Sequence, residues 1–178
     1  DQPVLALDAL QNAVLRLYGQ LTSGQVVASR TSSHSFAELT RLLDNVEMDS
    51  TVESDLQQAA WVVVAMRDVS STRAESRALS RLLSERPDLI RDKKVVVFAF
   101  GAPYYLDATD LTKISAYYGL YSKAPAFVDV AARILFQELP ANGASPVSVD
   151  GAGYSIARVV SPEPAQVVAI SPDLSSPD

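Results

Sequence analysis

Two apolar runs, residues 61–66 and residues 95–100, constrain the fold of this chain more than any other feature. Both consist of aliphatic and aromatic residues, and neither alternates between apolar and polar positions. A strand with one face in water does alternate, whereas a strand of a parallel sheet that is covered by helices on both faces does not. The two runs therefore predict two central strands buried on both faces.

The rest of the chain alternates between helical and strand-like segments. Apolar spacing of the helical kind predicts helices over residues 4–21, 36–43, 51–59, 72–86 and 127–136, and short apolar segments predict further strands at 25–29, 46–49, 114–121 and 146–149. Such an order is typical of an α/β fold. Right-handed crossovers then give a three-layer α/β/α sandwich with a mostly parallel, doubly wound sheet of the flavodoxin-like sort.

The proline and serine content divides the chain in two. Residues 1–158 carry the predicted elements and are interpreted as a single α/β sandwich domain. Residues 159–178 are rich in proline and serine, which resist helix and sheet formation, and are interpreted as an extended tail or linker.

Composition excludes several classes of function. The net charge of −6 and the absence of a basic cluster argue against a nucleic-acid partner. With no cysteine and a single histidine, the chain cannot build a cysteine or multi-histidine metal site. The glycine patterns of dinucleotide and P-loop sites are missing. No apolar run approaches the ~20 residues of a membrane span. We therefore expect no metal, no cofactor, no nucleic acid and no membrane span.

Three ionisable residues are placed where side chains can act in acid–base chemistry. Asp68 follows a predicted buried strand, where loops often carry active sites, but an acid before a helix also simply favours the helix dipole. Glu138 stands at a helix end before Pro140, and the same two readings apply to it. His34 lies at a predicted helix start, where a histidine commonly caps the helix or faces solvent. No catalytic role is assigned to any of them.

Tyrosines follow two of the predicted central strands. They are Tyr104, Tyr105, Tyr117, Tyr118 and Tyr121. Their rings could stack on a sugar, because aromatic faces suit the apolar faces of sugars, or they could form an interface with a neighbouring domain. Asp68, Tyr104, Tyr105 and Tyr121 are thus the candidate residues for a substrate rim or a domain interface.

Four segments between residues 60 and 150 are distinctive in their order and spacing: an apolar strand running into Pro-Tyr and an apolar residue at 95–106, the tyrosine-rich segment 117–122, the helix end at 131–138, and a proline- and glycine-containing segment at 140–149. Together they resemble the C-terminal α/β domain of family 3 glycoside hydrolases. The Pro-Tyr-x-Leu form is similar to the β-N-acetylhexosaminidase-like branch. The sequence departs from the family at Gln137, where the family has glycine, and at Ala144-Ser145, where it has Lys/Arg-Leu.

This resemblance implies an accessory role. In the family, the nucleophilic aspartate lies on an N-terminal (β/α)8 barrel, which would be the partner of this domain within a longer bacterial polypeptide, and carbohydrate would be the substrate. The alternatives are a free-standing module that binds a sugar or another small ligand, and a structural spacer between domains. The trailing Pro/Ser segment favours an extracytoplasmic location, secreted or at the cell surface.

Overall fold

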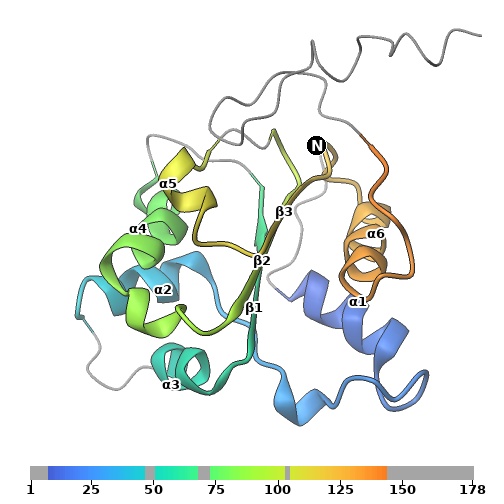
Figure 1. Ribbon diagram of the computed structural model, residues 1–178. Coiled ribbons are helices and arrows are strands. Elements are labelled where there is room, and N and C mark those ends of the chain that lie inside the picture. Colours follow the sequence, from blue (N-terminus) through green and yellow to red (C-terminus); the bar gives the residue numbers. More distant parts are fainter. Residues whose placement is uncertain (1–7, 47–50, 68–72, 103–104, 144–178) are drawn as a thin grey trace, which may run out of the picture.

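A parallel sheet of three strands forms the centre of the protein in a computed structural model, which describes residues 8–46, 51–67, 73–102 and 105–143. The strands are β1 (Trp61–Met66), β2 (Lys94–Ala99) and β3 (Ala116–Gly119), in the order β1-β2-β3. Val62 pairs with Val95 in the register of β1 on β2, and Val97 pairs with Tyr117 in that of β2 on β3. Helices lie on both sides of this sheet (Figure 1), which confirms the predicted α/β fold.

Five of the six described α-helices overlap helices that the sequence predicted, and α5 was not predicted. They are α1 (Ala9–Tyr18), α2 (Phe36–Leu43), α3 (Thr51–Gln58), α4 (Ala78–Glu85), α5 (Ala108–Leu111) and α6 (Ala126–Leu135). The start of α2 shows why: the Ser35 hydroxyl accepts from the backbone N–H of Glu38, and the Glu38 carboxylate accepts from the backbone N–H of Ser35. This capping box satisfies two donors that a helix start otherwise leaves unpaired.

Strand β2 is buried on both faces, as its unbroken apolar run predicted. Its odd-numbered residues Val95, Val97 and Ala99 face the helices α2 and α4, and its even-numbered residues face α1 and α6. Figure 1 shows these two helical layers on opposite sides of the strand. Val97, Phe98 and Ala99 are each 0% exposed. Because successive side chains of a strand point to opposite faces, only a run that is apolar at every position fits such a place.

The prediction that residues 61–66 form a strand buried on both faces is wrong for burial, although β1 is a strand. Trp61 is 56% exposed, Ala65 is also exposed, and the valines between them are half-buried. Within the described residues β1 pairs only with β2, so it lies at the edge of the sheet. The same apolar composition is therefore fully covered at the centre of the sheet and only partly covered at its edge.

The prediction of a strand at residues 25–29 is wrong. Only Val26 forms a bridge there, with Gly19, and a turn of 3-10 helix follows at Ala28–Arg30. The backbone N–H of Arg30 donates to the carbonyl of Val27 at 2.9 Å, and the Thr31 hydroxyl donates to that of Ala28 at 2.8 Å. These local bonds occupy groups that a strand would offer to a neighbour.

Several predictions fall outside the described residues. They concern the first residues of the helix at 4–21, most of the strand at 46–49, the first residue of the helix at 72–86, the strand at 146–149 and the tail at 159–178. No helix in the described part of the chain is both long enough and apolar enough to cross a membrane.

Charged side chains form hydrogen bonds that connect α3 to the segment after α4 and to the start of β2. Lys93, just before β2, donates its ammonium to the carbonyls of Gln57 and Ala59 at 3.0 and 2.6 Å, where α3 ends. Arg86, after α4, bonds to Glu53 of α3 at 2.5 Å and to Asp88. Cations near the last carbonyls of a helix complement its dipole, so Lys93 fixes the end of α3.

Two helices end in the same hydrogen-bonded motif, each with a non-glycine residue in the left-handed region. After α6, Gln137 has a φ of 59°, and the N–H groups of Gln137 and Glu138 donate to the carbonyls of Ile134 and Arg133. After α2, Asn45 has a φ of 55° and makes the equivalent bonds together with Val46. This is the Schellman motif, which favours glycine at that position and tolerates asparagine.

We expect Gln137→Gly to stabilise the protein by about 1 kcal/mol, because glycine removes the Cβ strain of the left-handed conformation. Asn45→Gly is the matched control and should gain less, since asparagine already tolerates this region. The measurement is the free energy of unfolding in urea. A loss of stability in Gln137→Gly would contradict the assigned helix end.

Candidate functional site

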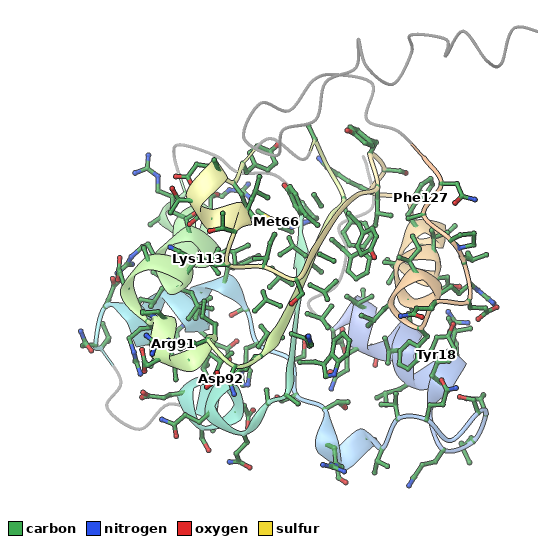
Figure 2. The ribbon with its side chains drawn as sticks, in the orientation of Figure 1. Tyr18, Met66, Arg91, Asp92, Lys113 and Phe127 are labelled. Carbon is green, nitrogen blue, oxygen red and sulfur yellow. The ribbon has the colours of Figure 1, made fainter. Side chains whose placement is uncertain are left out.

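The carboxyl ends of the three parallel strands meet at one edge of the sheet, where ligands of open α/β sheets bind. β1 ends at Met66, β2 at Ala99 and β3 at Gly119. Figure 2 shows Met66 on the side of β1 that faces α4 and α5. The candidate residues Tyr105 and Tyr121 follow β2 and β3, so both belong to this edge. Asp68 and Tyr104 lie outside the described residues.

A third tyrosine, Tyr117 of β3, lies close to both. Burial, together with the nearby phenols of Tyr105 and Tyr121, raises the pKa of the Tyr117 phenol to about 12, and the backbone of Tyr105 acts in the opposite direction. The rings of Tyr105 and Tyr117 pack against the same apolar cluster as α4. Tyr105, Tyr117 and Tyr121 are called the tyrosine group below.

The hydroxyl of Tyr117 is buried and makes no hydrogen bond of normal geometry with the described residues, although the backbone of Tyr105 is close enough to lower its pKa. A buried polar group without a partner is costly, so such groups are rare in native proteins. Tyr117 belongs to the tyrosine cluster seen in the sequence, but it is not among the four candidate site residues given above. The alternation of side chains along β3 could have distinguished it, since Tyr117 and Tyr118 point to opposite faces of the sheet. Tyr118 stacks on Phe98, with ring centroids 5.2 Å apart.

Tyr121 is held in an unusual backbone conformation. Its φ is 54°, and 42% of the residue is exposed. A bulky residue in the left-handed region is strained by about 1–3 kcal/mol, and such strain gathers at binding and switch positions. Tyr121 therefore presents an aromatic ring at the edge of the sheet with its backbone fixed in a strained turn.

The other two candidates for acid–base chemistry, Glu138 and His34, lie away from the tyrosine group. Glu138 accepts a hydrogen bond of 2.5 Å from the Tyr18 hydroxyl and forms an ion pair with Arg133. Tyr18, labelled in Figure 2 at the end of α1, also stacks on Phe136, with centroids 3.9 Å apart. Burial and then the bond to Glu138 raise the pKa of Tyr18. These contacts join α1 to the end of α6 and give Glu138 a structural role.

His34 lies before α2, and its Nε2 atom is 2.7 Å from Oδ2 of Asp55 in α3. The hydrogen bond from His34, and then one from Ser32, lower the pKa of Asp55. The aspartate thus forms a hydrogen bond with the histidine and lies near the serine. In a nucleophilic triad the serine bonds to the histidine, and no such bond activates Ser32 among the described contacts.

Sequence reasoning overlooked Asp110 of α5, a carboxylate that is only 7% exposed. Its backbone N–H donates to the side chain of Asp107, which caps α5, and Nζ of Lys113 lies 4.0 Å from its Oδ1. Nothing in a pattern of Asp-x-x-Asp distinguishes a buried acid from an exposed one. Among the residues that the structure describes, no cluster of three or more His, Asp or Glu side chains could hold a metal ion.

The chain matches no protein-family model, and comparisons with curated proteins and with solved structures also find no match. The candidate site therefore rests on the geometry of the tyrosine group alone.

We expect Tyr117→Phe to leave the free energy of unfolding unchanged or to raise it by up to about 1 kcal/mol, because it removes an unpaired buried hydroxyl. Tyr18→Phe is the matched control. It removes a hydroxyl that donates to the Glu138 carboxylate, and it should cost about 1–2 kcal/mol. Urea denaturation compares the two variants. A loss above about 1 kcal/mol in Tyr117→Phe would mean that a group outside the described residues pairs with this hydroxyl.

Proposed function

We propose that this chain is the accessory C-terminal domain of a family 3 glycoside hydrolase of the β-N-acetylhexosaminidase-like branch. In this proposal it packs on an N-terminal (β/α)8 barrel of the same polypeptide, which carries the catalytic nucleophile. The tyrosine-bearing edge of the sheet faces the barrel and borders the carbohydrate site. The chain by itself is then inactive.

The observation that carries the proposal is the backbone at Gln137. The sequence departs from the family's glycine at this position, yet Gln137 has a φ of 59° at the end of α6. Glycine is the residue that this conformation favours. Gln137 therefore adopts the left-handed backbone conformation that the family's glycine would favour at this position. The replacement of glycine by glutamine changes the side chain and keeps this conformation, which supports the resemblance.

The order of the resembling segments also supports the proposal. The segment 95–106 includes β2 and Tyr105, the segment 117–122 covers the end of β3 and Tyr121, and 131–138 is the second half of α6 with its Schellman motif. Of these three segments, 95–106 and 117–122 thus end at the carboxyl edge of the sheet. Aromatic side chains are enriched at protein interfaces, where a large ring is buried and its hydroxyl finds a partner.

The proposal is tested by hydrolysis of chromogenic N-acetylglucosaminide and glucoside substrates. The purified 178-residue chain, shown to be folded by circular dichroism, should give no turnover, because a retaining glycosidase needs two carboxyl-type groups about 5 Å apart and the family's nucleophile lies on the barrel. A longer polypeptide that includes the upstream segment should turn over one of the substrates.

The matched control is the longer polypeptide without residues 1–178. If it loses activity or thermal stability, the accessory role is supported. Turnover by the 178-residue chain alone, or an upstream segment that is not a (β/α)8 barrel, would overturn the proposal.

A further inference from the structure

The outer edge of β1 carries no further strand within the described residues. On the inner side, the backbone N–H of Lys94 donates to the carbonyl of Ala60 at 3.0 Å, at the start of the parallel ladder with β2. Successive residues of such a strand direct their backbone groups to opposite sides. The backbone N–H and C=O groups of Trp61, Val63 and Ala65 therefore point outward. A row of this kind is a template on which another strand can pair.

This edge lacks the features with which natural sheets protect an open edge. Residues 61–66 contain no charged residue, no proline and no glycine. Trp61 is the only tryptophan of the chain and is 56% exposed, and Ala65 is exposed as well. Charged residues, proline and bulges are the usual protection, and an apolar edge without them associates with another strand. We therefore expect a further strand to cover β1.

Basic residues stand at both ends of this edge. Arg67 follows the carboxyl end of β1. At the amino end, Lys94 pairs in register with Trp61, and the ammonium of Lys93 bonds to the carbonyl of Ala59. A second copy of the chain, paired antiparallel about a two-fold axis, would bring the arginine of one copy toward the lysines of the other, and like charges oppose such pairing. The charges favour an occupant with acids at both ends.

One apolar segment of the chain has acids at both ends. Residues 166–170 read Gln-Val-Val-Ala-Ile, a β-branched run that is typical of a strand. Glu163 precedes this run by three residues, Asp173 follows it by three, and residues 161–178 contain no Lys or Arg. Either direction of pairing thus brings one acid toward Arg67 and the other toward the lysines. The segment lies outside the described residues.

The chain before this run is long enough to reach the edge. Residues 144–165 separate it from Gly143, the last described residue. Fully extended, that connection spans up to roughly 70 Å. A globular chain of 178 residues has a radius of gyration of about 16 Å. The run can therefore reach β1 on a path around the outside of the domain.

We propose that residues 166–170 pair with the outer edge of β1 and extend the sheet by one strand, with Glu163 and Asp173 placed toward the basic residues at its two ends. Backbone hydrogen bonds to β1 supply the attachment, as in other cases where an extended segment is added to a sheet. The charged ends favour this segment over a second copy of the chain. The inference does not depend on the proposed glycosidase function.

Amide hydrogen exchange of the whole 178-residue chain tests this pairing. The outward amides of Val63 and Ala65 should be protected, as is expected of Val64, whose amide faces β2. The double variant Val167→Pro with Val168→Pro removes two successive N–H groups, one of which faces β1 in either direction of pairing. It should speed the exchange of the two outward amides about ten-fold, the scale of one hydrogen bond, and leave Val64 unchanged.

Two control variants change the same tail without changing the run. Ser175→Pro with Ser176→Pro places the prolines beyond residue 170 and should keep the outward amides protected. Glu163→Lys with Asp173→Lys puts bases opposite the basic ends and should speed the exchange of Val63 by about two- to five-fold, the scale of exposed ion pairs. Asp178→Lys is the matched charge control and should have no effect.

The fluorescence of Trp61 gives a second readout, because it is the only tryptophan. Quenching by acrylamide should increase in Val167→Pro with Val168→Pro and stay unchanged in the serine-to-proline control. Outward amides of Val63 and Ala65 that exchange as fast as unprotected ones in the unchanged protein would show that the edge is open, and the proposal would be wrong. Protection that persists in the double valine variant would also overturn it: dependence on protein concentration would then indicate a second copy, and independence another segment.

Discussion

The burial of β2 between two helical layers is the constraint on which the rest of the structure depends. Its residues contribute alternately to both apolar clusters, with Val95, Val97 and Ala99 in one and Val96 and Phe98 in the other, which Phe100 joins just after the strand. Each cluster in turn holds its own set of helices. Removing apolar surface from water is the main favourable term in folding, and a strand covered on both faces contributes twice to it. β1 and β3 take their positions by pairing with this strand.

Polar contacts then fix how the helices sit on the two clusters. On one face, Arg81 and Arg86 link α4 to the end of α2 and the start of α3. On the other face, Tyr18 and Glu138 join α1 to the end of α6. Exposed ion pairs add little stability, so their effect is mainly to select one arrangement among helices that the apolar clusters alone would accept. The His34–Asp55 contact, which joins the loop before α2 to α3, belongs to this class.

The tyrosine group shows how the fold creates a candidate site from residues far apart in sequence. Tyr105 follows β2, whereas Tyr117 and Tyr121 come from β3 and its end. Parallel pairing of β2 with β3 brings their carboxyl ends to the same edge, so the tyrosines gather there. The unpaired hydroxyl of Tyr117 and the strained backbone of Tyr121 both lie in this group. A domain interface or a substrate rim at this edge would use groups of this kind.

The α/β class, the central strand β2 and most helices could be predicted from the sequence, because apolar periodicity and capping residues act over a few neighbouring positions. Tyr105 and Tyr121 could also be predicted as candidates, since the order of residues along the chain shows which of them come near the ends of predicted strands. Packing between distant segments decides that β1 is an edge strand within the described sheet, that residues 28–30 form a turn, and that Asp110 is buried. It alone brought His34 to Asp55 across 21 positions. Burial and pairing depend on which segments cover a residue, and that is set by packing between distant parts of the chain.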